Sequence, residues 1–381
     1  MKKKILLAML LFWVSIFSGC WNYSEINDFS IAVGTGVDYD KKRDKLLLTT
    51  EVVYPMVTNG ETKLEAQIIK SEGQNFFDAI RNIIQITGKK VFWAHAKVFV
   101  IGEEVAKNKK ALITLLDMIK RDENFRDDIY IMLSKEKSAG DIFETDVLVQ
   151  DIVTFQMNDI IKNKKGVEKY YPVQLWKFVD DLASEGISPT LPTVRATEFK
   201  NKKVLEVYGT EVFKGIRPVG WLNGEETKTF LMIIDELEGS LLNIEKKDQK
   251  IGLEIFKNKT KVDPIYENEK ITMKMDVRTV LNISELESET DFISEKGRNL
   301  VKKEVESVIE KRIKTLIEKV QNQYASDIFG FGNYVERKYP EYWKIHKQNW
   351  NEIFKNLNIE VKSEVNIRGS ALRSKPVKVG D

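Results

Sequence analysis

Apolar residues at every second position predict half-buried strands in several parts of the chain. Residues 31–55 are rich in Val, Leu, Ile and Thr on either side of a charged turn at 40–45, which is typical of a β-hairpin. Residues 271–283 and 359–367 alternate apolar with charged or polar side chains, as strands do when they bury one face. We therefore expect an opening hairpin and two long one-sided strands in the C-terminal half.

Apolar residues three and four positions apart predict helices between these strands. The pattern over 76–84 is followed by Gly88, a typical helix end, and residues 103–121 repeat the pattern. Residues 297–324 keep it for about seven turns, with Lys and Glu on the opposite face. The remaining predictions are buried strands at 91–102 and 128–134, mainly helical structure over 138–182, strands at 203–215 and from 218, and a helix over 224–235.

This succession of elements predicts an α+β fold of several domains, with mixed or antiparallel sheets flanked by helices. Residues 188–196 contain two prolines and are expected to form an extended connector or an edge strand before a domain boundary near residue 200. The expected divisions are a signal segment at 1–19, an N-terminal region at 20–200 with a second subdomain from about 136, a C-terminal α+β domain at 201–369 and a mobile tail at 370–381.

The first twenty residues have the composition of an export signal that ends in a cysteine. Three lysines precede an uncharged apolar run at 5–17, which is shorter than the roughly 18 residues of a membrane-spanning helix. The small residues Ser18 and Gly19 precede Cys20, the only cysteine of the chain. The segment resembles the bacterial lipoprotein box, although Phe17 stands where that box usually has a branched aliphatic residue.

The resemblance to the lipoprotein box implies cleavage before Cys20 and a covalent diacylglyceryl group on its thiol. Two acyl chains hold a protein stably at a bilayer, whereas one chain does so only marginally. The alternative is a buried thiol that merely follows the signal. In either case a lone cysteine forms no internal disulfide, so the fold depends on its hydrophobic core.

The chain that this cleavage would leave is nearly neutral. Loss of the three N-terminal lysines changes the formal charge from +2 to −1. Recognition of a phosphate backbone requires a basic patch, so nucleic acid is not an expected partner. With 42% hydrophobic and 31% charged residues, the composition is that of an ordinary globular protein.

The sequence lacks the common motifs of catalysis and metal binding. Its two histidines, His95 and His346, lie in apolar or aromatic stretches and are expected to be structural. A zinc-protease motif, a nucleophile elbow and a phosphate-binding loop are all missing, and Gly34 and Gly36 lack the third glycine of a dinucleotide fingerprint. We therefore expect no catalytic residue, no metal and no cofactor, and a role in binding or assembly; an exported enzyme acting on the cell wall is a less favoured alternative.

Large aromatic residues are concentrated between positions 329 and 350, around Gly330 and Gly332. The simpler interpretation is a local core, because these rings bury much apolar area. The alternative is that part of this surface binds a partner, since aromatic side chains often dominate binding energy. The candidate partner-docking residues are Phe331, Tyr334, Trp343 and Trp350.

Five blocks of unusual composition occur in order along the chain: "GCWNYSEINDFSIAVGTGVD", "YGTEVFKG", "VGWLNGEET", "DIFGFGNYVERKYPEYW" and "VNIRG". Together they resemble the Ger(x)C lipoproteins, the C subunits of spore nutrient germinant receptors. The resemblance implies several small domains of sheet flanked by helices, no catalytic residues, and Cys20 as the lipidated position.

The same resemblance implies a place and partners. Such a lipoprotein would lie on the extracytoplasmic face of the inner spore membrane and act with a multi-spanning A subunit and a transporter-like B subunit in nutrient-triggered germination. The main alternative is a solute-binding lipoprotein of a transporter, which closes two lobes around its ligand.

Overall fold

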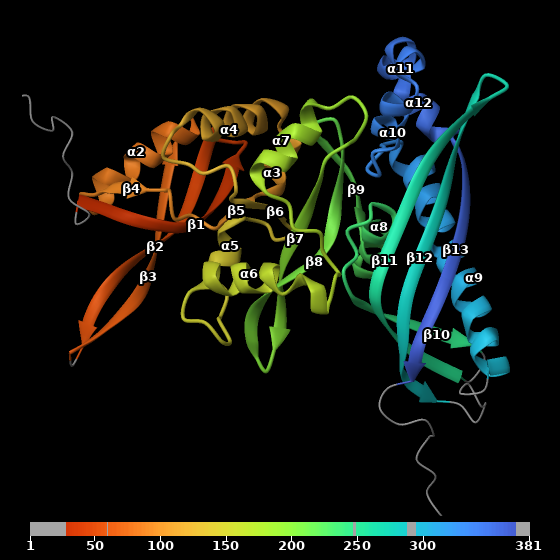
Figure 1. The fold of residues 1–381 in the computed structure, drawn as a ribbon. Coiled ribbons are helices and arrows are strands. Elements are labelled where there is room, and N and C mark those ends of the chain that lie inside the picture. The colour runs from red at the N-terminus through yellow and green to blue at the C-terminus, as the bar shows by residue number, and fades with distance from the viewer. Residues whose placement is uncertain (1–27, 59, 247–248, 288–294, 371–381) are drawn as a thin grey trace, which may run out of the picture.

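The computed structural model describes residues 28–58, 60–246, 249–287 and 295–370. The expected signal segment, Cys20 and the expected tail after residue 370 lie outside these residues. Within them the chain forms two sheets flanked by helices (Figure 1). The predicted fold class, a multi-domain α+β protein with mixed sheets, is confirmed.

The first sheet has nine strands, in the order β3-β2-β1-β5-β6-β7-β8-β9, with β4 also paired to β1. Its two ends are antiparallel hairpins, whereas β1, β5, β6 and β7 in the middle run parallel to one another. The strands are β1 (Phe29–Asp40), β2 (Lys45–Thr58), β3 (Glu61–Gly73), β4 (Lys90–Phe92), β5 (Val98–Ile101), β6 (Tyr130–Ser134), β7 (Thr190–Phe199), β8 (Lys202–Lys214) and β9 (Arg217–Leu222).

Helices cover both faces of the first sheet (Figure 1). Strand β5 shows how this is achieved, because Phe99 and Ile101 pack into one core and Val98 and Val100 into the other. One face carries α2 (Phe76–Thr87), α3 (Glu103–Lys107), α4 (Lys109–Arg121) and α7 (Leu175–Ala183), and the other carries α5 (Gly140–Phe143) and α6 (Val153–Lys162), which is followed by the short helix η2 (Lys164–Gly166).

Two predicted elements are each divided in the structure. The helix expected over 103–121 is two helices, because the side chain of Asn108 accepts a hydrogen bond from Ala111 N (3.1 Å) and starts α4 there. The strand expected over 91–102 is interrupted between β4 and β5 by a turn that Ala96 N closes on Trp93 O at 2.9 Å. Apolar spacing alone does not show such breaks.

The expectation of a connector or an edge strand at 188–196 is wrong, because β7 lies inside the sheet between β6 and β8. A proline is tolerated there since the register of β7 with β8 shifts between Pro192 and Val194. Strand β6 pairs with β7 only at Thr193 and Val194, just after the proline. Strands β7 and β8 form a hairpin whose turn is at residues 200–201, so the first sheet continues past the domain boundary expected near residue 200.

The second sheet has the order β10-β11-β12-β13, in which β12 and β13 are parallel and the other pairs antiparallel. Alternate residues Met273, Met275 and Val277 of β12 are buried beneath the flanking helices, as their spacing predicted. The strands are β10 (Ser240–Lys246), β11 (Gln249–Glu267), β12 (Lys270–Glu287) and β13 (Asn358–Ser370).

Helices fill the space between the sheets and connect β12 to β13. Helix α8 (Gly224–Ile233) follows β9, and its start is fixed by a capping box between Asn223 and Glu226. The parallel pair β12 and β13 requires a crossover, which the long helix α9 begins. The crossover contains α9 (Glu295–Lys319), the π-helical turn η3 (Val320–Tyr324), α10 (Phe331–Lys338), α11 (Pro340–His346), η4 (Lys347–Asn349) and α12 (Trp350–Lys355).

Candidate functional site

The aromatic segment folds around a buried carboxylate, that of Asp327. Its oxygens accept hydrogen bonds from Phe329 N (3.1 Å), Gly332 N (2.9 Å) and Trp350 Nε1 (2.9 Å). Gly330 has φ +71, a conformation that other residues rarely adopt, and α10 begins at the next residue. Burial raises the pKa of Asp327 to about 6, while the three donors act in the opposite direction. Asp327 therefore fixes the turn that starts α10.

Three of the four candidate docking residues belong to the core. Phe331, Trp343 and Trp350 are buried, and the two indole rings pack edge to face with centroids 5.3 Å apart. Buried side chains offer no surface that a partner could contact. The docking interpretation is therefore wrong for these three residues, which form part of the local core. Of the four, Tyr334 keeps an exposed part and lines a cleft.

The turn that holds Asp327 also contacts the chain leading into β7. Ser188 N donates to the backbone oxygen of Asp327 at 2.7 Å, and Asn333 N donates to the backbone oxygen of Gly186 at 3.3 Å. The approach at Gly186 is so close that a Cβ placed there would lie 2.7 Å from Asn333 N. This junction joins the first sheet to the helices of the second.

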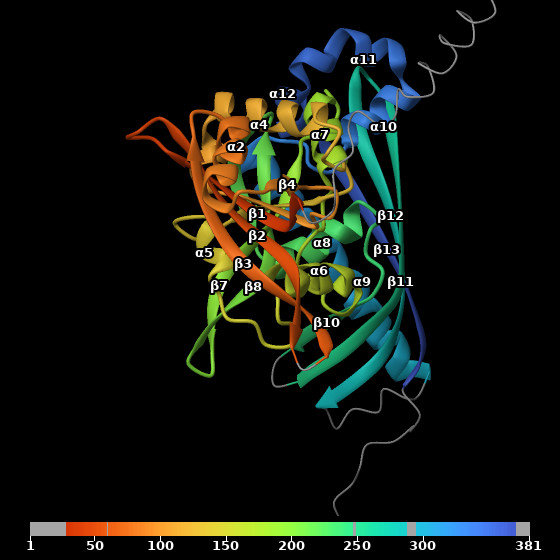
Figure 2. The ribbon, with the colours of Figure 1, turned by 90° about the vertical axis from the view of Figure 1, so that its left-hand side faces the viewer.

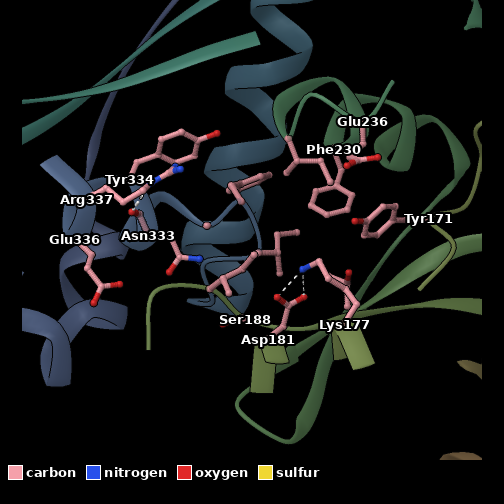
Figure 3. Close-up of a pocket in the computed structure, with 16 residues that line it drawn as sticks. Tyr171, Lys177, Asp181, Ser188, Phe230, Glu236, Asn333, Tyr334, Glu336 and Arg337 are labelled. Atoms are coloured by element: carbon pink, nitrogen blue, oxygen red, sulfur yellow. Dashed lines mark hydrogen bonds and ion pairs between the residues drawn. The ribbon is translucent and has the colours of Figure 1, made fainter. Parts of the chain in front are cut away.

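A cleft of about 470 Å³ opens beside this junction (Figure 3). Its volume lies within the range of roughly 300 to 1,000 Å³ typical of small-molecule sites. One wall is formed by α7 and the start of β7, and the other by α8, α10 and the turn before α10. The residues that determine its chemistry are Tyr171, Lys177, Asp181, Phe230, Tyr334 and Arg337.

Lys177 and Asp181 place opposite charges on the α7 wall (Figure 3). They are four residues apart on one helix face, and Lys177 Nζ donates to both carboxylate oxygens at 2.5 and 2.6 Å. Burial raises the pKa of Asp181, and the neighbouring ammonium of Lys177 opposes that shift. Burial and the nearby carboxylates also raise the pKa of Tyr171, so its hydroxyl stays protonated and able to donate.

The opposite wall combines aromatic surface with a further cation. Phe230 packs edge to face against Tyr171 with ring centroids 5.6 Å apart, which gives the cleft an apolar floor. The guanidinium carbon of Arg337 lies 4.6 Å from the ring centroid of Tyr334. Groups of both charges therefore surround apolar rings, an arrangement suited to a small ligand that carries an anionic and a cationic group.

The described residues offer little for metal or imidazole chemistry. No group of three His, Cys, Asp or Glu side chains among them converges to hold a metal ion. His95 is exposed in the turn after β4, beside the ring of Phe92, which corrects the expectation of a structural position for this histidine in an apolar strand. His346 stacks on Tyr342 with ring centroids 4.1 Å apart, at the end of α11. Neither histidine lines the cleft.

Sequence reasoning missed most of the cleft. Its two walls come from residues 171–190 and 230–337, which no local pattern connects. The pair Lys177 and Asp181 reads as an ordinary solvated helix pair in the sequence. The one available signal was Tyr334 within the aromatic segment, which does line the cleft.

Comparison with known proteins identifies the class to which this chain belongs. The protein-family model described as "Spore germination protein N-terminal domain" matches residues 22–196. A second family model, "Spore germination B3/ GerAC like, C-terminal", matches residues 208–371. Both describe spore germination proteins, and together they cover nearly all of the chain. The chain belongs to the Ger(x)C family, as the resemblance of its sequence blocks predicted.

Individual relatives agree with the family models. Spore germination protein KC of Bacillus subtilis (strain 168) is 24% identical over 407 residues, which cover 99% of this chain and 98% of the relative. Spore germination protein B3 of the same organism is 24% identical over 364 residues, covering 93% and 94%. The crystal structure of the GerBC protein matches with a TM-score of 0.58 and 20% identity, covering 91% of this chain and all of that chain, and so has a similar fold.

None of the helices in the described residues is both long enough and apolar enough to cross a membrane. Cys20 lies outside these residues, and its lipidation stays a prediction.

Proposed function

We propose that this chain is a lipid-anchored subunit of a spore germinant receptor, held by Cys20 and acting with membrane-spanning A and B subunits. The observation that carries the proposal is the ordered match to both germination-family models over residues 22–371. The sequence "FSGC" before the mature start supports the anchor, because small residues precede the only thiol of the chain. We place the chain on the extracytoplasmic face of the inner spore membrane.

The proposed role is assembly and signalling without catalysis. The cleft presents a paired lysine and aspartate where an enzyme would need a nucleophile with a base beside it. Proteins KC and B3, to which the chain is similar, are spore germination proteins, which agrees with a receptor subunit.

A deletion strain tests the proposal. Spores that lack this chain are exposed to single nutrients, and germination is followed as the fall in optical density. Calcium dipicolinate serves as the control, since it triggers germination without receptors. Loss of the response to one nutrient class with an intact response to calcium dipicolinate supports the proposal. An unchanged response to every nutrient, in a strain that also lacks the sister receptors, contradicts it.

The anchor has its own test. In the deletion strain, Cys20→Ala should restore neither membrane retention nor the nutrient response, whereas the unaltered chain restores both. Fractionation of spore membranes followed by immunoblotting measures retention. Full retention of the Cys20→Ala chain would show that another part of the protein holds it at the membrane.

The cleft supports a second candidate function, binding of a small solute between two lobes. The observation in its favour is that charged groups of both signs, Lys177 and Asp181 on one wall and Arg337 on the other, line about 470 Å³ of space. Calorimetry with the chain from residue 21 onward and a panel of free amino acids tests it, with Asp181→Asn as the cleft variant. Micromolar binding that Asp181→Asn weakens tenfold or more would favour the solute-binding function.

A further inference from the structure

Three loop ends carry exposed, large apolar side chains at one end of the molecule. They are the end of the β2–β3 hairpin, the loop between α5 and α6, and the β7–β8 turn. Figures 1 and 2 share the vertical axis, and in both views these three ends lie in the lower part of the molecule, where β10 and β12 also end. The β2–β3 hairpin projects away from the rest of the sheet in Figure 1.

The exposure of these side chains is high for residues of their type. Val149 in the α5–α6 loop is 90% exposed and Val57 at the hairpin end is 69% exposed. Leu64, on the other strand of the hairpin, is 51% exposed, and Phe199 at the β7–β8 turn is 48% exposed. Single exposed apolar residues are common on soluble proteins. These four are distinguished by their position at three loop ends that lie at a similar level of the molecule (Figures 1 and 2).

Basic residues accompany the apolar ones at the β7–β8 turn. Lys200 follows Phe199 and lies 5.4 Å from its ring centroid, and Lys202 comes next on the far side of the turn. Long lysine side chains can keep their ammonium groups at the level of lipid phosphates while the neighbouring apolar group lies deeper. The attraction of an anionic bilayer adds to such contacts.

The position of the predicted anchor brings this end of the protein close to a bilayer. Ile31, near the start of β1, pairs with Val53 in β2, so Val57 lies four residues, about 13 Å along the strand, beyond the level of Ile31. Cys20 precedes Asp28, the first described residue, by eight positions, which span at most about 28 Å. A lipid on Cys20 therefore keeps the hairpin end within reach of the headgroups.

We propose that these three ends form a membrane-contact face that rests on the anionic bilayer holding the anchor. Val57, Val149 and Phe199 enter the headgroup region, and Lys200 and Lys202 contact the phosphates. A bilayer is the chosen occupant because the apolar groups are separate points at one level, which a fluid interface accommodates and a groove-binding peptide does not. The inference rests on the proposed lipid anchor.

The experiment uses the full lipidated chain in vesicles of phosphatidylcholine and phosphatidylglycerol. Because the Cys20 thiol is consumed as a thioether, a cysteine introduced elsewhere is the only free thiol. Val57→Cys carries an environment-sensitive fluorophore, and brominated lipids act as quenchers. The matched control is Ile345→Cys on α11, a residue that is 75% exposed on an element at the opposite end of the molecule in Figure 1.

We expect the fluorescence intensity of the probe at position 57 to rise at least twofold when the chain binds vesicles, and brominated lipid to quench it. The fluorescence of the probe at position 345 should not change. Lys200→Glu combined with Lys202→Glu should reduce that gain at least threefold on anionic vesicles and leave it unchanged on neutral ones. No gain at position 57 in a chain that still floats with the vesicles overturns the contact face and leaves the anchor intact.

Two further outcomes would also overturn the membrane-contact face. A chain that fails to float refutes the anchor and this inference with it. A gain at position 57 that requires added receptor membrane subunits overturns the bilayer as occupant and assigns the hairpin to a protein partner.

Discussion

Glu168 is a buried carboxylate in an unusual conformation at the contact between the two sheets. Its φ is +50, its carboxylate accepts from Glu238 N at 2.7 Å and Gly239 N at 3.3 Å, and its Oε2 has no hydrogen-bond partner. Burial raises its pKa from 4.5 to about 7, against the effect of those donors and of Lys164. Glu168 thus holds the chain before β10 to the segment that follows η2, although burial of its carboxylate is unfavourable for the charged form.

The first prediction concerns the pH dependence of stability. The folded pKa of Glu168 is above its unfolded value, so its contribution is fully present below pH 4.5 and is lost as the pH rises toward about 7. Relative to Glu168→Gln, the unaltered chain should therefore lose up to about 3 kcal/mol of unfolding free energy across that window. Urea unfolding at several pH values measures this difference. Glu318→Gln on an exposed site of α9 is the control, and an equal pH dependence in both variants would contradict the prediction.

The second prediction concerns Asp327. Asp327→Asn replaces one carboxylate oxygen by an NH₂ group, which cannot accept a hydrogen bond. In one orientation of the amide this group faces Phe329 N, and in the other it faces both Gly332 N and Trp350 Nε1. We expect a loss of about 2 kcal/mol in the free energy of unfolding at pH 7, because a buried donor is left unpaired. Asp263→Asn, at an exposed pair with Lys338, should change it little. Equal midpoints for the two variants in denaturant titrations would show that Asp327 is not a structural centre.

The aromatic residues show how far single residues could be predicted. Their crowding around Gly330 correctly indicated a local core, and Tyr334 does lie on a cleft. What the sequence could not show is that Asp327 organises this core, because its donors are two backbone groups and one indole at position 350. A carboxylate next to apolar residues looks the same in a sequence whether it is solvated or buried.

At the scale of elements, the periodicity of apolar residues predicted the individual helices and strands better than it predicted which strands pair. The hairpin β1–β2, helix α2 with its end at Gly88, and the strands β12 and β13 were predicted close to their observed bounds. Strand β3 was not predicted. It lies at the edge of the sheet and is buried only toward its C-terminal end, so most of its residues at 61–67 are polar. The parallel pairing of β12 with β13 could not be predicted either, since it depends on the crossover through α9.

The third prediction concerns the contact between the segment before β7 and the start of α10. Gly186→Ala would place a Cβ 2.7 Å from Asn333 N and 2.9 Å from the carbonyl carbon of Gly332, so one of the two segments must move. We expect a loss of roughly 1 to 3 kcal/mol in the free energy of unfolding. Gly166→Ala is the matched control, because nothing lies within 4 Å of a Cβ at that position. Thermal unfolding of both variants measures the difference, and equal stabilities would mean that the contact is loose.

At the scale of the whole molecule, the two sheets share one core. Val212 and Leu222 of the first sheet belong to the same buried cluster as α8, α9 and the strands of the second sheet. Phe230 of α8 extends this continuity, because its ring packs on Tyr171 from the first part and on Phe329 from the crossover, with centroids 5.6 and 6.1 Å away. Continuous apolar packing of this kind favours unfolding of both parts together.

The last prediction follows from this shared core. Phe230→Ala should lower the free energy of unfolding by about 3 to 5 kcal/mol, because it leaves a cavity where the two parts meet. Hydrogen exchange measured by mass spectrometry should then show an equal loss of protection in peptides from β5 and from β12, since both depend on one global opening. Phe256→Ala, at a ring that is 46% exposed on β11, should alter neither. If protection falls in β12 alone, the sheets open independently, and the cleft between them would be free to change shape without unfolding either one.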